Sequence, residues 1–165
     1  PGPGALMVNM DQTEIKKRLA RAMYVFPGAI GVNNHMGSLF TADQRAMSIV
    51  LTEIKSSGQL FLDSLTTSNS LVGQLGDKLN VPVVSRDVFL DDINKEDEIV
   101  RRLREVEKIA LDKGTAIAIG HPRVTTLRVL EKWLANLPEK KIRLAPLSAV
   151  AKTRLSRMQN DGALD

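Results

Sequence analysis

The 165-residue chain has no cysteine and few aromatic residues. The lack of cysteine excludes disulfides, thiolate nucleophiles and cysteine-ligated zinc, and it fits either the cytoplasm or the periplasm. Phe, Trp and Tyr make up only 4% of the residues, and no dense basic run is interleaved with them. Stacking platforms for bases are therefore scarce, and no nucleic-acid partner is expected.

Long hydrophobic runs and a recognisable signal peptide are also missing. No apolar stretch approaches the roughly 18 residues that a membrane-spanning helix needs, so no membrane span is expected in this chain. The chain opens with Pro-Gly-Pro-Gly and not with methionine, so the lack of a targeting segment does not decide where the protein works. The signatures of a nucleophile elbow, a Walker loop, a dinucleotide-binding loop and a zinc-protease helix are not found.

What is present is ordinary for a globular protein. Hydrophobic residues make up 43% of the chain and charged residues 25%, with a net charge of +4. A chain of this length can bury a sizeable core, and no linker-like break or internal repeat divides it. We therefore expect one domain over residues 1–165.

Two kinds of apolar pattern alternate along the chain. The spacing of apolar residues predicts helices at residues 11–25, 42–56, 69–79, 95–113, 126–136 and 148–158. Short apolar runs bounded by turn residues predict five strands, at residues 29–32, 60–62, 81–84, 115–120 and 143–146. Asp11 with Glu14, and Thr41 with Gln44, are expected to form capping boxes. This alternation indicates an α/β fold whose parallel sheet, open or closed into a barrel, is covered by helices.

Polar side chains follow four of the predicted strands. In chain order they are His35, Asp63, the pair Arg86 and Asp87, and His121. The carboxyl ends of parallel strands share one edge of a sheet, so we expect these groups to form a site. Simpler interpretations stay open: an asparagine-rich turn around His35, capping by the two aspartates, and a rigid turn where His121 precedes a proline.

The residue types at this edge suit hydrolytic chemistry. Imidazole nitrogens and carboxylate oxygens bind zinc, nickel, cobalt or iron, and a bound metal lowers the pKa of water and polarises a carbonyl. A histidine that is not bound to metal could protonate a leaving group. Arg86 could orient Asp87 or stabilise developing negative charge.

Five segments carry a family likeness. They are Gly-Val-Asn-Asn-His-Met-Gly-Ser (31–38), Phe-Leu-Asp-Ser (61–64) with Thr-Thr (66–67), Arg-Asp-Val-Phe-Leu-Asp (86–91), Ala-Ile-Gly-His-Pro (118–122) and Leu-Ala-Pro-Leu-Ser (144–148). In this order they resemble the divergent polysaccharide deacetylase family, a remote branch of the NodB-like carbohydrate esterase superfamily. The resemblance covers about residues 1–150.

The resemblance implies a distorted (β/α) barrel and metal-dependent hydrolysis of N- or O-acetyl groups on bacterial envelope carbohydrate. The implied substrate is a polysaccharide or an amino-sugar oligomer, and the implied location is periplasmic or otherwise extracytoplasmic. A divalent metal is implied as the cofactor, with zinc the expected ion.

Carried over by position, the resemblance makes His35 a metal ligand and His121 the general acid. It places Asp63, Arg86 and Asp87 among the catalytic residues of the pocket. The expected substrate-binding residues are Asn33, Asn34, Ser38 and Ser64.

The chain also departs from the family pattern. The family normally has, ahead of these motifs, one strand that ends in Asp-Asp and another that ends in His-Leu-Pro. This chain has neither, so we expect it to correspond to the C-terminal part of such a barrel. Leu65 stands where the family often has a basic residue. Whether the chain is itself an enzyme is therefore open. The alternatives are a non-catalytic carbohydrate-binding or envelope-associated module with a degenerate site, or a plain α/β scaffold.

The departures have a structural consequence as well. A barrel without its first strands would leave an open sheet edge and an exposed apolar wall. Such surfaces invite pairing with another chain, so we expect association, with a homo-oligomer as one form of it, or a missing N-terminal portion that is supplied elsewhere.

Overall fold

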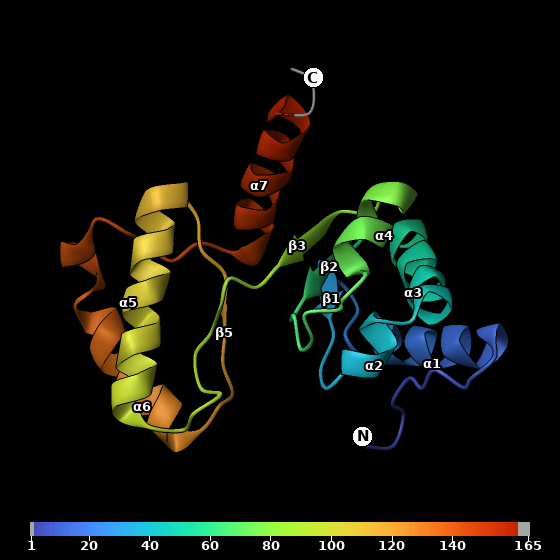
Figure 1. The fold of residues 1–165 in the computed structure, drawn as a ribbon, viewed down its shortest axis with the longest axis horizontal. Helices are drawn as coiled ribbons and strands as arrows, with labels where there is room; N and C mark the ends of the chain where they lie inside the picture. Colours follow the sequence, from blue (N-terminus) through green and yellow to red (C-terminus); the bar gives the residue numbers. More distant parts are fainter. Residues whose placement is uncertain (1, 162–165) are drawn as a thin grey trace. The chain divides into compact units, whose positions relative to one another are not determined.

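The computed structural model describes residues 2–161, with side chains as far as Met158. The chain forms two compact units, the first ending at Ser85 and the second beginning at Arg86. Each unit is an arrangement of helices around a small parallel sheet (Figure 1). None of the helices in the described part of the chain is both long and apolar enough to cross a membrane.

The first unit contains a three-stranded parallel sheet in the order β1-β2-β3. Its elements are α1 (Gln12–Val25), β1 (Gly31–Asn33), α2 (Ser38–Thr41), α3 (Gln44–Ser56), β2 (Leu60–Asp63), α4 (Val72–Leu79) and β3 (Val83–Ser85). In Figure 1, α3 and α4 lie together on one side of this sheet. The sheet register pairs Val32 with Phe61, and Phe61 with Val83.

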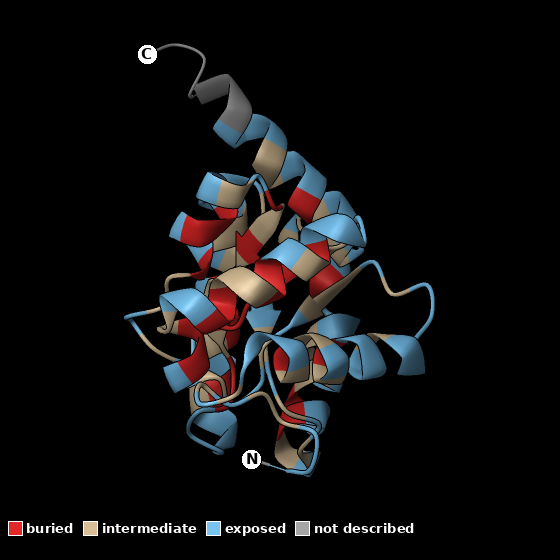
Figure 2. Ribbon diagram, turned by 90° about the vertical axis from the view of Figure 1, so that its right-hand side faces the viewer, coloured by how far each residue is buried: buried red, intermediate tan, exposed pale blue. Residues whose placement is uncertain are grey.

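The core of the first unit forms where amphipathic helices meet the sheet. α1 contributes Ile15 and Leu19, and β2 contributes Phe61. α3 supplies the largest share, with Ala46, Met47, Val50, Leu51 and Ile54. Figure 2 shows buried and exposed residues alternating along the helices, as expected where one side of a helix faces the core.

The second unit is built around a two-stranded parallel sheet. Its elements are β4 (Val88–Phe89), α5 (Glu96–Lys113), β5 (Ala118–Ile119), α6 (Val124–Ala135), the 3-10 helix η1 (Leu137–Lys140) and α7 (Leu147–Asp161). Val88 pairs with Ala118, and Phe89 with Ile119. The core of this unit lies between the sheet and helices α5 and α6, and it contains Val88, Leu90, Ile99, Leu103, Val106 and Val129.

The structure confirms the parallel α/β architecture but contains no closed barrel. Within residues 2–161 the strands form two separate sheets of three and two strands. The strand predicted at residues 143–146 is irregular chain instead, because it has no partner strand and Pro146 has no N–H to donate. The strand predicted at residues 115–120 is shorter than expected and covers only Ala118–Ile119, because β4 has only two residues that pair with it.

The two predicted helix caps had different outcomes. Asp11 caps α1 as expected, and its Oδ1 accepts a hydrogen bond from the Glu14 N–H at 2.8 Å. Thr41 does not cap α3: it lies buried at the end of the short helix α2 and donates its hydroxyl to the Gly37 carbonyl at 3.0 Å. Asp43 caps α3 instead. Its carboxylate accepts a hydrogen bond from the Ala46 N–H at 2.7 Å, and its negative charge is stabilised by the positive end of the helix dipole.

Candidate functional site

The loops that follow β1 and β2 are joined by amide and hydroxyl contacts. The Asn34 Oδ1 accepts a hydrogen bond from the Ser64 N–H at 2.8 Å, and the Ser64 hydroxyl donates to the Asn34 carbonyl at 2.7 Å. The Asn33 Nδ2 donates to the Ser64 hydroxyl oxygen at 3.2 Å. Ser38 contacts the same second loop further along, through the Thr66 carbonyl at 3.1 Å. The four residues expected to bind substrate thus lie in two segments that touch one another, from the end of β1 to the start of α2 and directly after β2.

Asp63 ends β2 and is almost fully buried. Its Oδ1 accepts a hydrogen bond from the Leu65 N–H at 2.9 Å, and its Oδ2 accepts one from the Ser70 hydroxyl at 2.6 Å. These contacts hold Leu65 in the left-handed region at a φ of 48°. They are the contacts of a carboxylate that organises a turn, which is the simpler interpretation that the sequence left open.

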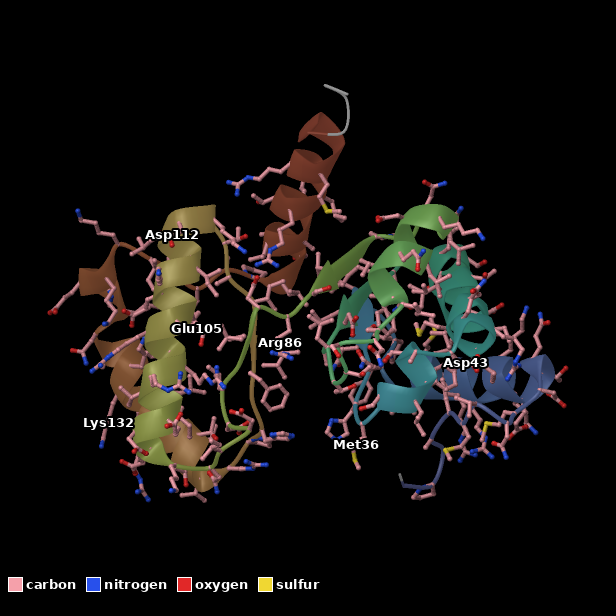
Figure 3. The ribbon with its side chains drawn as sticks, viewed as in Figure 1. Met36, Asp43, Arg86, Glu105, Asp112 and Lys132 are labelled. Atoms are coloured by element: carbon pink, nitrogen blue, oxygen red, sulfur yellow. The ribbon has the colours of Figure 1, made fainter. Side chains whose placement is uncertain are left out.

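His35 is exposed at the tip of the β1–α2 loop, beside Met36, which Figure 3 shows pointing outward. The loop forms one end of a largely apolar hollow of about 810 Å³ within the first unit. No three His, Asp or Glu side chains converge as metal ligands among the residues that the structure describes. The described donors therefore do not make the three- or four-ligand set that zinc requires.

In the second unit, His121 and Asp91 form a hydrogen-bonded pair. The His121 Nδ1 lies 2.9 Å from the Asp91 Oδ1, and the His121 N–H donates to the Asp91 Oδ2 at 2.8 Å. The carboxylate is completely buried, while the imidazole is 36% exposed. One carboxylate thus fixes both the backbone and the ring of a histidine that reaches the surface of its unit.

The surroundings of Asp91 favour its ionised form. Burial by itself would raise the pKa of this carboxyl. The hydrogen bonds from Thr126 and from the backbone and ring of His121, with the charge of that ring when it is protonated, outweigh burial and lower the pKa below its ordinary value. An ionised Asp91 can only accept hydrogen bonds, so the imidazole nitrogen that faces it, Nδ1, carries a hydrogen.

Arg86 and Phe89 lie next to this pair. The ring centroids of Phe89 and His121 are 5.5 Å apart at an interplanar angle of 57°. The guanidinium carbon of Arg86, labelled in Figure 3, lies 5.1 Å from the centroid of the Phe89 ring. Arg86 thus stacks on the aromatic ring that supports the imidazole. A hollow of about 430 Å³ opens on the helix side of the unit and is also lined by His121.

Asp87 has a different set of partners. Its Oδ2 accepts a hydrogen bond from the Ile117 N–H at 2.7 Å and forms an ion pair with Arg154 of α7. Its own N–H donates to the Ile117 carbonyl at 2.8 Å. Asp87 therefore ties β4, the approach to β5 and α7 together, and these contacts are structural.

The sequence interpretation thus located His121 but missed its partner Asp91. A signal was available, because Asp91 directly follows the apolar run 88–90, just as Asp63 follows 60–62. The second unit brings His121, Asp91, Phe89 and Arg86 together, and the first brings together Asn33, Asn34 and Ser64. The expectation that His35, Asp63, Arg86, Asp87 and His121 share a single site stays a prediction.

Comparison with known proteins gives consistent matches. The family model described as divergent polysaccharide deacetylase matches residues 1–151. An uncharacterized protein of Haemophilus influenzae is 38% identical over 136 residues, which is 82% of this chain and 49% of that protein. The uncharacterized protein YibQ of Escherichia coli is 36% identical over 133 residues, 81% of this chain and 42% of that protein.

A solved structure is also similar. The crystal structure of the uncharacterized protein ATU2773 from Agrobacterium tumefaciens C58 superposes with a TM-score of 0.88 at 31% sequence identity. The match covers 91% of this chain and 61% of that one. The chain thus spans about half the length of the curated relatives it matches, and somewhat more of the solved protein.

Proposed function

The chain belongs to the divergent polysaccharide deacetylase family, and from this premise we propose that it takes part in the hydrolysis of N- or O-acetyl groups on bacterial envelope carbohydrate. The observation that carries the proposal is the His121–Asp91 pair, a half-exposed imidazole held by a buried carboxylate. Family membership supplies the reaction class, and the pair supplies a group able to transfer a proton.

The reaction needs a proton at one defined point. Water attacks the acetyl carbonyl, and the bond to the sugar nitrogen or oxygen breaks to release acetate. The departing amine or alcohol must then receive a proton. Protonated His121 is suited to give this proton, which leaves the ring neutral with its remaining hydrogen on the Nδ1 that Asp91 holds. A positioned histidine of this kind contributes about 10²–10⁴-fold to rate. Phe89 limits the rotation of the ring by packing against it.

A divalent metal, with zinc as the expected ion, is part of the proposal for the whole protein. Metal bound beside the substrate would activate water and polarise the acetyl carbonyl. His35 is the one residue of this chain that we propose as a ligand, because its exposed imidazole is a donor that zinc prefers. The described residues do not complete such a site, so the proton-transfer role of His121 is argued without it.

The remaining parts of the proposal follow from the family. The substrate is a polysaccharide or amino-sugar oligomer. The exposed side chains of Asn33 and Ser38 in the first unit offer an amide and a hydroxyl to its hydroxyls and acetamido groups, whereas Ser64 is buried. Work on envelope carbohydrate implies a periplasmic or otherwise extracytoplasmic location. Fractionation of cells that produce the natural full-length polypeptide tests that location directly.

The test of the reaction is acetate release from acetylated chitin- or peptidoglycan-derived oligomers by the full-length polypeptide. We expect His121→Ala and Asp91→Asn to lower kcat by about 10²–10⁴-fold with little change in KM. Asp92→Asn is the matched control, because Asp92 is an exposed neighbour that contacts Arg102 instead of His121. Absence of acetate release, or full activity of His121→Ala, would contradict the proposal.

A second function is favoured by a specific observation. No metal-ligand triad is found among the described residues, and Leu65 replaces the basic residue frequent in the family. Both suit a carbohydrate-binding or envelope-associated module that has lost the chemistry. That alternative predicts oligosaccharide binding that survives both His35→Ala and a chelator, with no acetate released; calorimetry on the same oligomers separates the two functions.

A further inference from the structure

Thr126 lies directly behind the His121–Asp91 pair. It is the third residue of α6 and is almost fully buried. Its hydroxyl donates to the Asp91 Oδ2 at 2.8 Å, in a hydrogen bond between two buried side chains. A threonine hydroxyl inside a helix often bonds a carbonyl of its own helix. Here it bonds the carboxylate of another segment, 35 residues earlier in the chain.

The carboxylate of Asp91 divides its two oxygens between different donors. Oδ2 receives both the Thr126 hydroxyl and the His121 N–H, each at 2.8 Å. Oδ1 is thereby left to the imidazole Nδ1 at 2.9 Å. The guanidinium of Arg123 donates to the backbone carbonyl of the same aspartate, at 2.6 Å. These contacts leave the carboxylate little freedom to turn about its Cβ–Cγ bond.

We propose that Thr126 is a positioning residue for the proton-transferring histidine, acting through Asp91. Its hydroxyl holds the carboxylate plane so that one oxygen faces Nδ1, which fixes the orientation of the imidazole and keeps a hydrogen on Nδ1. The proposal rests on the proposed function, because the positioning matters for catalysis only if His121 transfers the proton. Nothing in the sequence pattern marks this threonine apart from Thr125 beside it.

Removing the hydroxyl has two physical consequences. A buried carboxylate oxygen loses one of its two donors and is held less firmly. The ionised form of Asp91 is also favoured less, because hydrogen bonds to a carboxylate lower its pKa. The charged groups that face this aspartate are His121 and Arg123, and both stay in place. A carboxylate that is held less firmly can turn away from Nδ1, so the imidazole is free to adopt its other tautomer.

The experiment compares three substitutions in the full-length polypeptide. Thr126→Val removes the hydroxyl with little change of shape, Thr126→Ser restores it, and Thr125→Val is the matched control one residue earlier on the same helix. We expect Thr126→Val to lower kcat for acetate release about tenfold with KM unchanged, and to move the acid limb of the pH–rate profile to higher pH by about one unit. Thr126→Ser and Thr125→Val should both behave like the wild type.

A second readout does not depend on activity. The 165-residue chain has only two histidines, so long-range ¹⁵N–¹H spectra of this chain resolve both rings. The signals lost in His35→Ala belong to His35, and the remaining ones belong to His121. We expect His121 to carry its hydrogen on Nδ1 in the wild type and in Thr126→Ser, and to show mixed tautomers in Thr126→Val. A wild-type ring protonated mainly on Nε2 would overturn the proposal even if Thr126→Val does not fold.

The outcomes separate this proposal from the proposed function. If the wild type releases no acetate but the tautomer changes as described, the reaction is wrong and the positioning of the ring stands. If acetate is released and Thr126→Val matches Thr125→Val in pH profile and tautomer, the reaction stands and Thr126 is only a packing residue.

Discussion

Three aspartates, Asp63, Asp87 and Asp91, lie at the end of a strand or within two residues of it, and their partners give them different roles. Asp63 accepts hydrogen bonds from its own loop, and Asp87 pairs with the guanidinium of Arg154. Of the three, Asp91 is the one that bonds a histidine ring. A carboxylate held by a turn or by an arginine is occupied with structure, whereas one that holds an exposed imidazole can support proton transfer. At the scale of single residues, partners decide function more than position along the strand does.

The ionised state of Asp91 contributes to stability as well as to the site. Because its pKa is lowered in the folded state, the contribution is complete above the ordinary aspartate pKa of about 4 and is lost as the pH falls through the lower, folded value. We predict that Asp91→Asn reduces the free energy of unfolding at pH 7 by about 1.5–3 kcal/mol, since the amide replaces a charged acceptor of three hydrogen bonds.

Urea unfolding across the pH range measures this effect. The stability difference between the wild type and Asp91→Asn should be present above about pH 4 and should shrink as the pH falls further and the wild-type carboxylate becomes protonated. Asp92→Asn provides the control and should show no such narrowing. A difference that stays constant down to pH 2 would mean that the carboxylate is not ionised in the folded protein.

The sequence could locate His121 but not Asp91, and the reason is physical. A histidine just past an apolar strand is a local pattern. The pairing with Asp91 depends on the register of β4 against β5, which aligns Phe89 with Ile119 and, two residues further on, Asp91 with His121. No local pattern carries that register. Asp87 was expected in the site because it follows a strand. No local pattern could show that its carboxylate pairs with Arg154, which lies 67 residues further along the chain.

At the scale of elements, helices were predictable and strand lengths were not. α1 and α5 begin and end within a residue of their predicted bounds, because the apolar periodicity lies within each helix and the end signals, such as Asp11 and Gly114, lie directly beside it. The run at 115–120 is apolar over its whole length, yet only Ala118 and Ile119 pair. The length of a strand depends on its partner as much as on its own composition.

Gly31 shows how one residue sets the spacing of an element that carries the site. A Cβ at this position would lie 2.5 Å from the Leu60 carbonyl oxygen and 2.6 Å from the Leu60 Cγ. The oxygen belongs to the backbone of β2 and cannot move aside without disturbing the sheet. β1 and β2 can therefore approach one another here only because residue 31 is glycine. The loop that contains His35 follows β1, so its starting position depends on this close approach.

We predict opposite effects for two glycine substitutions in the first unit. Gly31→Ala should lower the free energy of unfolding by about 1–3 kcal/mol, because the added methyl group collides with β2. Gly73→Ala lies in α4 with nothing within 4 Å of the added carbon, and it should raise stability by about 0.5–1 kcal/mol through helix propensity. Urea denaturation measures both changes, and equal effects would contradict the close approach of β1 to β2.

At the scale of the whole molecule, the first unit has an open sheet edge and an apolar surface. β1 pairs only with β2 within the described residues, so its other edge has unpaired backbone groups. Large apolar side chains are exposed in the segments on either side of this strand: Tyr24, Val25, Phe26, Ile30, Met36 and Leu39. Open edges and exposed apolar patches of this kind are where proteins associate.

We therefore predict that the 165-residue chain self-associates through this surface, as its sequence led us to expect. Sedimentation velocity over a hundredfold range of concentration should show species larger than the monomer. Ile30→Lys places a charge directly before the open strand and should weaken association at least tenfold, because a lysine at an edge opposes pairing. Leu111→Lys removes an equally exposed apolar residue from α5 in the second unit and should leave association unchanged. A monomer at every concentration, or equal effects of the two lysines, would show that the apolar surface beside β1 is not an interface.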